Sequence, residues 1–116
     1  MAPFDTFWVR LKAELSQLPT EQGCHYGTAR KWSQHSGDLG EDFVFLYKGG
    51  NVIECGTTST NNVRSVSSAE FEKVYAVWKG YKSGEVPRSH IVHDLSVQNA
   101  SWIIPLLKKH EHLMHD

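Results

Sequence analysis

Histidines are the residues of this 116-residue chain whose spacing comes closest to that of a metal site. His90 and His93 stand three positions apart and Asp94 follows, so a helix through them would place both imidazoles on one face. Two ligands without a third and a fourth do not specify a coordination geometry. We therefore interpret the pair as solvated or capping histidines, and we expect neither a metal ion nor another cofactor.

Three further histidines, His110, His112 and His115, stand near the end of the sequence. Imidazole binds Ni, Cu and Zn readily, so this group is a second candidate for metal capture. Chain ends are usually poorly ordered, whereas a metal site needs ligands that are held in place. We therefore expect the polar segment 108–116 to fray and its histidines to be mobile.

A nucleophilic site needs a thiol or hydroxyl beside a base, and Cys24 next to His25 is the adjacent example. Neighbouring side chains on a strand point to opposite faces, so a hydrogen bond between these two is not expected. Cys55 is the other cysteine, and two isolated thiols are typical of a reduced, cytoplasmic protein. We predict that the thiols are buried or inert, and we leave open whether the chain is an enzyme, with a non-catalytic role favoured.

Basic and aromatic residues alternate over the segment 73–88, where four basic residues and one acidic residue leave a net charge of +3: Lys73, Lys79, Lys82, Arg88 and Glu85. Three aromatic residues interleave with them: Tyr75, Trp78 and Tyr81. Phosphate contact and base stacking would use such side chains together. The aromatic residues also lie on one apolar helix face, where core packing is the ordinary explanation.

The helix that carries this segment is the best-defined element of the sequence and is predicted over residues 69–81. Ser67 is followed by Glu70 at the spacing of a capping box, in which each side chain satisfies an amide at the helix start. Gly80 weakens the helix by about 1 kcal/mol relative to alanine. Gly84 is placed to end the helix in a left-handed conformation.

Other helices flank this one in the chain. Apolar residues at helical spacing predict an N-terminal helix over residues 4–18, which Pro19 ends. A short helix is expected over 88–95. Asn99 is placed to cap a last helix, inside which Pro105 costs about 3 kcal/mol unless the helix kinks or begins near it.

Strands are predicted between the N-terminal helix and the helix over 69–81. Residues 43–47 and 52–56 flank Gly49, Gly50 and Asn51, so we expect a hairpin there and not a phosphate-binding loop. Residues 57–62 are six consecutive Thr, Ser and Asn residues, which is typical of a loop. Two short strands are expected over 25–32 and 63–66.

Length and composition bound the architecture. At 116 residues, with 40% hydrophobic and 22% charged residues, the chain has the size and composition of one globular domain over 1–116. We predict an α+β fold, in which a three- to four-stranded antiparallel meander packs with an N-terminal helix and two to three C-terminal helices. The net charge of −1 supplies no global attraction to nucleic acid or membranes, and we expect neither a signal peptide nor a membrane-spanning helix.

Aromatic and apolar residues spaced for helix packing recur in FEKVYAVWKGYKSGEVPRS (71–89) and SVQNASWIIPLL (96–107). This C-terminal half resembles short bacterial proteins of unknown function that are similar to products of mobile (integron) gene cassettes. The resemblance implies a compact bacterial module and transfers no catalytic residue. The positions of interest within it are Arg88, Asn99, Ser101 and Trp102.

Three functions compete. Thirteen aromatic residues without a catalytic set favour a non-catalytic binding or assembly module that forms a homo-oligomer, with a dimer favoured. The segment 73–88 favours a nucleic-acid-binding module. A pocket between sheet and helices, with His25, His90 or His93 as an acid-base group, would make a ligand-binding protein or a small enzyme. The candidate binding residues are Lys79, Tyr81, Lys82, Arg88, Asn99, Ser101 and Trp102.

Overall fold

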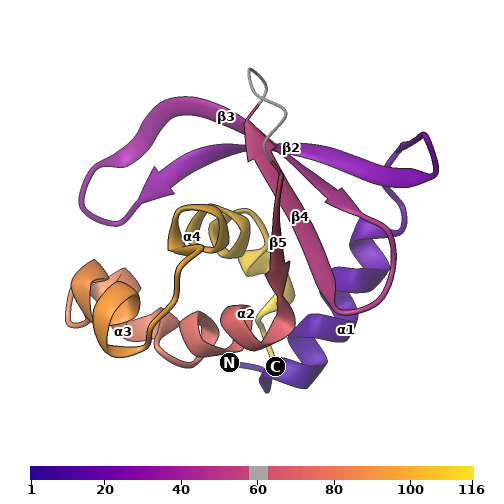
Figure 1. Cartoon of the computed structure of the whole chain (residues 1–116). Coiled ribbons are helices and arrows are strands. Elements are labelled where there is room, and N and C mark those ends of the chain that lie inside the picture. Colours follow the sequence, from indigo (N-terminus) through magenta and orange to yellow (C-terminus); the bar gives the residue numbers. More distant parts are fainter. Residues whose placement is uncertain (58–62) are drawn as a thin grey trace.

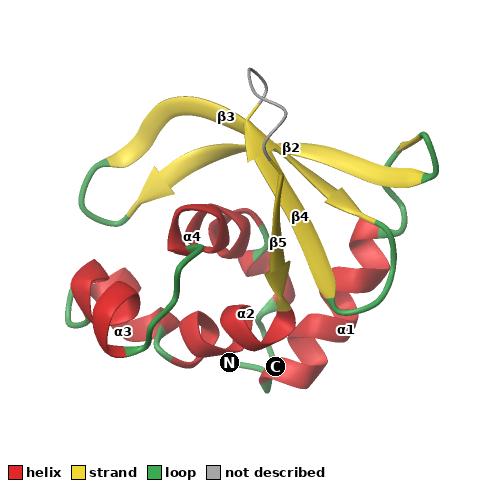
Figure 2. Ribbon diagram, viewed as in Figure 1, coloured by secondary structure: helices red, strands yellow, loops and turns green. Residues whose placement is uncertain are grey.

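The computed structural model of the protein describes residues 1–57 and 63–116. A single antiparallel sheet arches over a group of helices, all of which lie on one side of it (Figures 1 and 2). This arrangement confirms the predicted α+β fold. None of the helices in the described residues has the length and apolar character needed to cross a membrane. The loop predicted over 57–62 lies outside the described residues, apart from Thr57, which ends a strand.

The sheet has five strands in the described residues, whereas the sequence predicted three to four. They lie side by side in chain order, each antiparallel to the next, as a meander. The additional strand is a two-residue edge strand, which is too short to leave a pattern in the sequence. The strands are β1 (Thr20–Glu21), β2 (Cys24–Ser33), β3 (Gly37–Tyr47), β4 (Val52–Thr57) and β5 (Val63–Ser67).

The hairpin of β2 and β3 is longer than the loop-rich composition of residues 20–42 suggested. Its outer part contains a bulge, because three residues of β3, from Leu39 to Glu41, stand opposite Lys31 alone. Gly40 supports the bulge with a φ of 78°, a left-handed value that glycine adopts without a steric penalty.

The helical elements, in chain order, are α1 (Phe4–Leu15), α2 (Ser68–Ala76), α3 (Trp78–Ser83), the π-helical turn η1 (His90–Asp94), α4 (Ala100–Lys109) and the 3₁₀ turn η2 (Glu111–Leu113). The first helix ends three residues earlier than predicted. The short helix expected over 88–95 is a π-turn, in which the Leu95 amide donates to the His90 carbonyl at 3.0 Å. Asn99 is the residue before α4, as predicted.

The helix predicted over 69–81 is divided into α2 and α3 at Val77, whose φ and ψ are −111° and 13°. The predicted capping box is wrong. The Ser67 side chain makes no capping hydrogen bond, and Glu70 instead accepts a hydrogen bond from Asn99 at 2.9 Å. Gly84 ends α3 with a φ of 86°, which confirms the left-handed stop.

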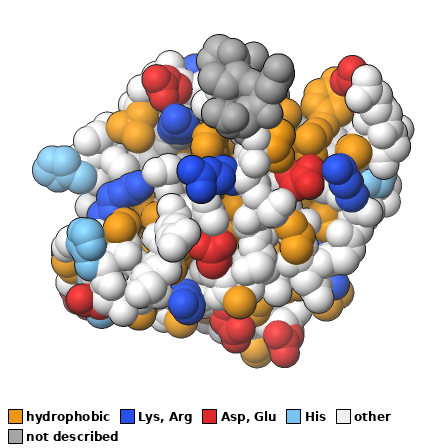
Figure 3. All heavy atoms as spheres, in the orientation of Figure 1, with side chains coloured by type: hydrophobic (Ala, Val, Ile, Leu, Met, Phe, Trp, Pro, Cys, Tyr) orange, Lys and Arg blue, Asp and Glu red, His pale blue; other side chains and the backbone are white. Residues whose placement is uncertain are grey.

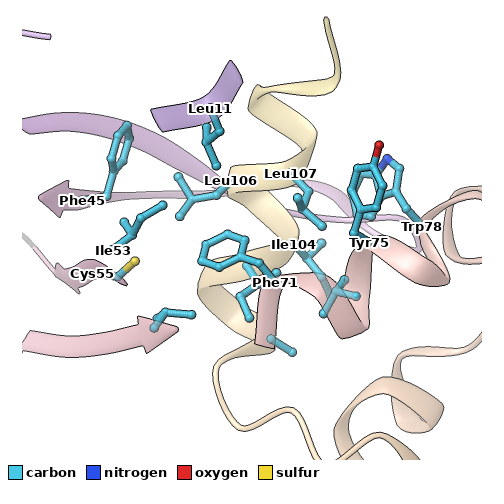
Figure 4. Packing of buried hydrophobic residues seen from close by; sticks show 14 of the residues in the cluster. Leu11, Phe45, Ile53, Cys55, Phe71, Tyr75, Trp78, Ile104, Leu106 and Leu107 are labelled. Atoms are coloured by element: carbon cyan, nitrogen blue, oxygen red, sulfur yellow. The ribbon is translucent and has the colours of Figure 1, made fainter. Parts of the chain in front are cut away.

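The core lies between the sheet and α2, and α4 runs through its middle (Figure 1). Because α4 has the sheet on one side and α2 on the other, its apolar residues are buried around most of its circumference. Figure 4 shows α4 side chains among those of the strands and of α2 and α3: Ile104, Leu106 and Leu107 lie near Phe45, Ile53, Cys55, Phe71, Tyr75 and Trp78.

The segment 108–116, which the sequence predicted to fray, packs against α1 in the structure. Arg10 on α1 donates hydrogen bonds to the carbonyl oxygens of Leu113 and His115, at 3.1 and 2.6 Å. The Met114 side chain is buried. These contacts join residues that are about a hundred positions apart, so local composition did not indicate them.

Candidate functional site

The candidate residues predicted from sequence are divided among three places. Lys79 and Lys82 line a hollow of about 600 Å³, while Tyr81 and Arg88 line a second hollow on the other side of α3. The remaining three, Asn99, Ser101 and Trp102, belong to neither. The short helix α3 therefore carries three of the seven predicted residues, Lys79, Tyr81 and Lys82.

The hollow that Lys79 and Lys82 line, which we call the Trp78 groove, has a volume of about 600 Å³. It forms where α3 meets η2 and the residues that follow η2. Its walls combine apolar side chains with charged ones. The lining residues are Met1, Trp78, Lys79, Lys82, Ser83, Glu111, Met114 and His115.

Glu111 is the carboxylate of the groove, and both of its oxygens are engaged. Oε2 accepts hydrogen bonds from Lys82 Nζ at 2.8 Å and from the Trp78 indole N–H at 3.2 Å, and Oε1 accepts one from Lys108 Nζ at 2.8 Å. Burial alone would raise the pKa of Glu111, but the hydrogen bonds from Lys108, Lys82 and Trp78 outweigh burial and lower it. The carboxylate is therefore held ionised. The hydrogen bond between Lys108 and Glu111 also raises the pKa of Lys108.

Three aromatic rings form a cluster behind the groove. Trp78 stacks on Tyr81 with ring centroids 5.8 Å apart, and Trp32 from β2 lies 6.3 Å from Trp78. The Lys82 and Lys108 ammonium groups lie 5.5 and 5.3 Å from the centre of the Trp32 ring, a cation–π distance. The aromatic cluster therefore fixes both lysines that share Glu111.

Trp32 lies next to the β3 bulge described above. Lys31 lies over the ring of Trp102 on α4 at 5.2 Å, so two consecutive residues of β2 both contact the helical side of the sheet. In a regular strand they would face opposite sides. The sequence did not predict that Trp32 belongs to the site, although Gly40 gave a local signal, since an isolated glycine within a strand suggests a bulge.

Glu111 and Met114 were also missed, because they lie in the segment that was expected to fray. A local signal was present for Glu111. Lys108 stands three positions before it, a spacing that brings two charged side chains together in a helical turn.

The second hollow, which we call the Tyr81 hollow, has a volume of about 430 Å³ and lies between the tip of the β2–β3 hairpin and the loop after α3. The buried Tyr81 hydroxyl accepts a hydrogen bond from the Gln34 amide at 3.1 Å. Arg88 donates to the Ser101 hydroxyl at 3.0 Å, so two predicted residues contact each other. The lining residues are Ser33, Gln34, His35, Ser36, Tyr81, Gly84, Val86, Pro87 and Arg88.

Asn99 and Trp102 have structural partners. Asn99 binds Glu70, as described above, and Trp102 packs edge-on against Phe43 of β3 with ring centroids 5.1 Å apart. Both side chains are half-buried. Packing against Phe43 accounts for Trp102, and the hydrogen bond between α4 and α2 accounts for Asn99.

Two of the three C-terminal histidines, His110 and His112, contact Glu14 of α1. His110 is 3% exposed, donates from Nδ1 to the Leu106 carbonyl at 2.7 Å and has Nε2 3.3 Å from a Glu14 oxygen. His112 Nε2 lies 2.7 Å from the other Glu14 oxygen. Burial lowers the pKa of His110, although the Leu106 carbonyl and the Glu14 carboxylate act in the opposite direction.

Two other histidines with a possible chemical role, His25 and His90, form hydrogen bonds within the protein. His90 is hydrogen-bonded to Asp94 at 2.8 Å, and His25 Nδ1 donates to the Leu18 carbonyl at 2.9 Å. Both cysteines are free thiols, with Cys24 half-buried and Cys55 buried. Within the described ranges, no group of three or more histidine, cysteine, aspartate or glutamate side chains is arranged to hold a metal ion.

The face of the sheet opposite the helices carries apolar side chains at its centre. On β3 the buried Phe43, Phe45 and Tyr47 alternate with half-buried Val44 and Leu46, which therefore point outward. Strand register places Tyr26 beside Leu46 on this outer face, and a hollow of about 560 Å³ lies there. Gly56 of β4 separates Val44 from the exposed Val63 of β5.

Comparisons of the chain with protein-family models, with curated proteins and with solved structures found no match.

Proposed function

We propose that this protein is a small non-catalytic binding module and that the Trp78 groove holds its ligand. The observation that carries the proposal is a hollow of about 600 Å³ that contains Lys79 and Lys82. Ligand pockets of proteins usually have volumes of roughly 300–1,000 Å³ and combine apolar walls with a few polar groups. The Trp78 groove has both properties.

The state of Glu111 supports a non-catalytic role. A general base works best when its pKa lies near the working pH, whereas hydrogen bonds lower the pKa of Glu111 below its ordinary value. Both Glu111 oxygens accept hydrogen bonds, and two of the three donors are ammonium groups. This carboxylate serves to hold the groove together, which leaves binding as the function that the groove suits best.

A titration followed by ¹H–¹⁵N NMR tests the proposal. Small organic fragments of different charge, added to millimolar concentration, are expected to shift the backbone amide signals of Lys79, Ser83 and His115 and the indole N–H signal of Trp78. The indole N–H of Trp8, which is bonded to Asn51 at 3.0 Å outside the groove, is the internal control. A panel in which no fragment moves the groove signals would contradict the proposal.

A pair of serine variants sharpens this test. Ser83 is exposed and lines the groove, so Ser83→Tyr is expected to narrow the groove and abolish the shifts. Ser89 is exposed and lies outside the groove, so Ser89→Tyr is expected to leave them unchanged. Equal loss in both variants would mean that the shifts do not report the groove.

Self-association is a second candidate function, favoured by the apolar outer face of the sheet. Antiparallel sheets that face water on one side usually carry polar side chains there. Tyr26, Val44 and Leu46 instead lie at the centre of this face, and Val63 on β5 is 52% exposed. A second copy of the chain bound face to face would cover these side chains and form a symmetric dimer.

Light scattering tests self-association. The wild-type protein is expected to show the mass of a dimer, and Val63→Glu is expected to shift it toward the mass of a monomer. Val9→Glu is the matched control, because Val9 is 62% exposed on α1, away from the sheet. A strict monomer at high micromolar concentration counts against the dimer.

Nucleic-acid binding has less support from the side chains that would perform it. Tyr75, Trp78 and Tyr81 are at most 5% exposed, so none of these rings presents a face on which a base could stack. On the face of the molecule in Figure 3, Lys and Arg side chains are scattered among acidic and hydrophobic ones. Nucleic-acid binding, a cytoplasmic location and kinship with gene-cassette products stay predictions of the sequence.

A further inference from the structure

Positive charge exceeds negative charge around the Trp78 groove. Lys82 and Lys108 both bind Glu111, so one carboxylate is shared by two ammonium groups. Lys79 stands three positions before Lys82 on α3, on the same side of the helix, and lines the same groove. Three ammonium groups and one carboxylate leave a local net charge of +2.

Among the described residues that line the groove, Lys79 is the cation without a carboxylate partner. Its side chain is exposed, and within the described part of the chain no carboxylate forms an ion pair with it. Met1 also lines the groove, and its amino group is paired with Asp116 at 3.2 Å. Unlike these cations, Lys79 gains an ion-pair partner only when an anion enters the groove.

The remaining walls of the groove are apolar. Met1 provides a flexible thioether side chain that adapts to the shape of a bound group, and the buried Met114 presents a small apolar surface beside it. Trp78 is 2% exposed, so only an edge of its indole reaches the groove. A ligand that fits these walls has a compact apolar part next to its charged group.

We infer that the Trp78 groove binds a small organic anion, a carboxylate or a phosphate monoester, whose charged group lies between Lys79 and Lys82 and whose apolar part contacts Met1 and Met114. This inference rests on the function proposed above and adds the chemical class of the ligand. A carboxylate or phosphate there would neutralise positive charge that Glu111 alone does not balance.

The test uses probes that share one ring and differ in charge: phenyl phosphate, benzoate, benzamide and benzylamine. Benzamide is the matched neutral control for benzoate, because the two molecules have nearly the same shape. Phenyl phosphate and benzoate are expected to shift the Trp78 indole N–H signal, and the shifts are expected to weaken as salt is added. Benzamide and benzylamine are expected to leave the signal unchanged over the same concentrations.

Two lysine variants locate the charge that matters. Lys79→Gln is expected to weaken anion binding by about fivefold, the effect of losing one exposed ion pair. Lys109→Gln removes the same charge at the end of α4, from an exposed side chain outside the groove, and is expected to leave binding unchanged. Equal affinities in both variants and in the wild type would overturn the inference.

The outcomes separate this inference from the proposed function. If benzamide binds as well as benzoate, the groove is a binding site but not an anion site, and this inference alone fails. It also fails alone if neither anion binds while other fragments of the wider panel shift the groove signals. If no probe and no fragment shifts them, both proposals fail.

Discussion

Asn99 Nδ2 donates a 2.9 Å hydrogen bond to Oε2 of Glu70, and this bond ties the residue before α4 to the first turn of α2. Both side chains are half-buried. A hydrogen bond to a charged group is worth about 1.5–3 kcal/mol. The bond therefore contributes to the docking of α4, the central helix of the core, against α2.

A double-mutant cycle measures this contribution. Asn99→Ala and Glu70→Ala are each expected to lower the free energy of unfolding in urea by about 1–2 kcal/mol. The double variant is expected to lose less than the sum of the two, with a coupling energy of about 1 kcal/mol. Strictly additive losses would show that the two side chains do not interact.

Ser67→Ala is the matched control for Glu70. Because the Ser67 side chain makes no capping hydrogen bond, its removal is expected to change the free energy of unfolding by less than about 0.5 kcal/mol. A capping serine would cost about 1 kcal/mol when replaced by alanine. A loss of that size would indicate that Ser67 and Glu70 form the capping box, and it would contradict the pairing of Glu70 with Asn99 instead.

Gly27 on β2 leaves room for the ring of Phe45, its cross-strand neighbour on β3. A Cβ atom at Gly27 would lie 2.6 Å from Cζ of this ring, which is fully buried. Gly27→Ala is therefore expected to destabilise the protein by about 1–3 kcal/mol in thermal or urea unfolding, because the ring must move within a packed core. Thr28→Ala, at the exposed neighbouring position, is expected to cost less than about 0.5 kcal/mol.

A second substitution tests whether the close contact is the cause. Phe45→Leu shortens the side chain and removes the atom that would meet the new methyl group. Gly27→Ala is expected to cost less in the Phe45→Leu background than in the wild type. An equal cost in both backgrounds would assign the effect to the strand backbone instead.

The two thiols differ in reactivity. Burial raises the pKa of Cys55 to about 12, so this thiol is neutral at ordinary pH, and a thiolate is the reactive form. Under native conditions a disulfide reagent is expected to modify Cys24 and to leave Cys55 intact until the protein unfolds. In the Cys24→Ser variant, the native protein is expected not to react, whereas the unfolded protein is expected to consume one equivalent of the reagent. Fast modification of Cys55 in the folded state would contradict its burial.

Protonation of His110 is expected to make the protein less stable in acid. Because burial lowers its pKa in the folded state, the unfolded chain takes up a proton more readily once the pH falls below about 6.5. The contribution of neutral His110 to stability is therefore complete above that pH and is lost as the pH falls through the lowered pKa. Glu14, His112 and Lys109 are the titratable groups that face or adjoin the ring.

Unfolding measured from about pH 7.5 to about pH 5 tests this expectation. The stability difference between wild type and His110→Asn is expected to shrink as the pH falls, because asparagine does not titrate. A difference that grows in acid would mean that Glu14 stabilises a charged His110 ring.

Local pattern determined the helices and central strands of this fold, since amphipathic periodicity and turn residues act within a few positions of one another. The N-terminal helix, the hairpin around Gly49 and Gly50, and the stop at Gly84 follow from such signals. The apolar face of the helix predicted over 69–81 is buried, as its spacing indicated. Lys79 and Lys82 were also identified as candidates from their place on that helix.

Tertiary contacts decided the rest. Glu70 binds Asn99 instead of capping its own helix, and Arg10 holds the C-terminal segment against α1. The groove exists because that segment brings Glu111 to Lys82. Each of these pairs joins residues far apart in the chain, and a single sequence reveals which side chains can interact but not which of them the folded backbone brings within bonding distance.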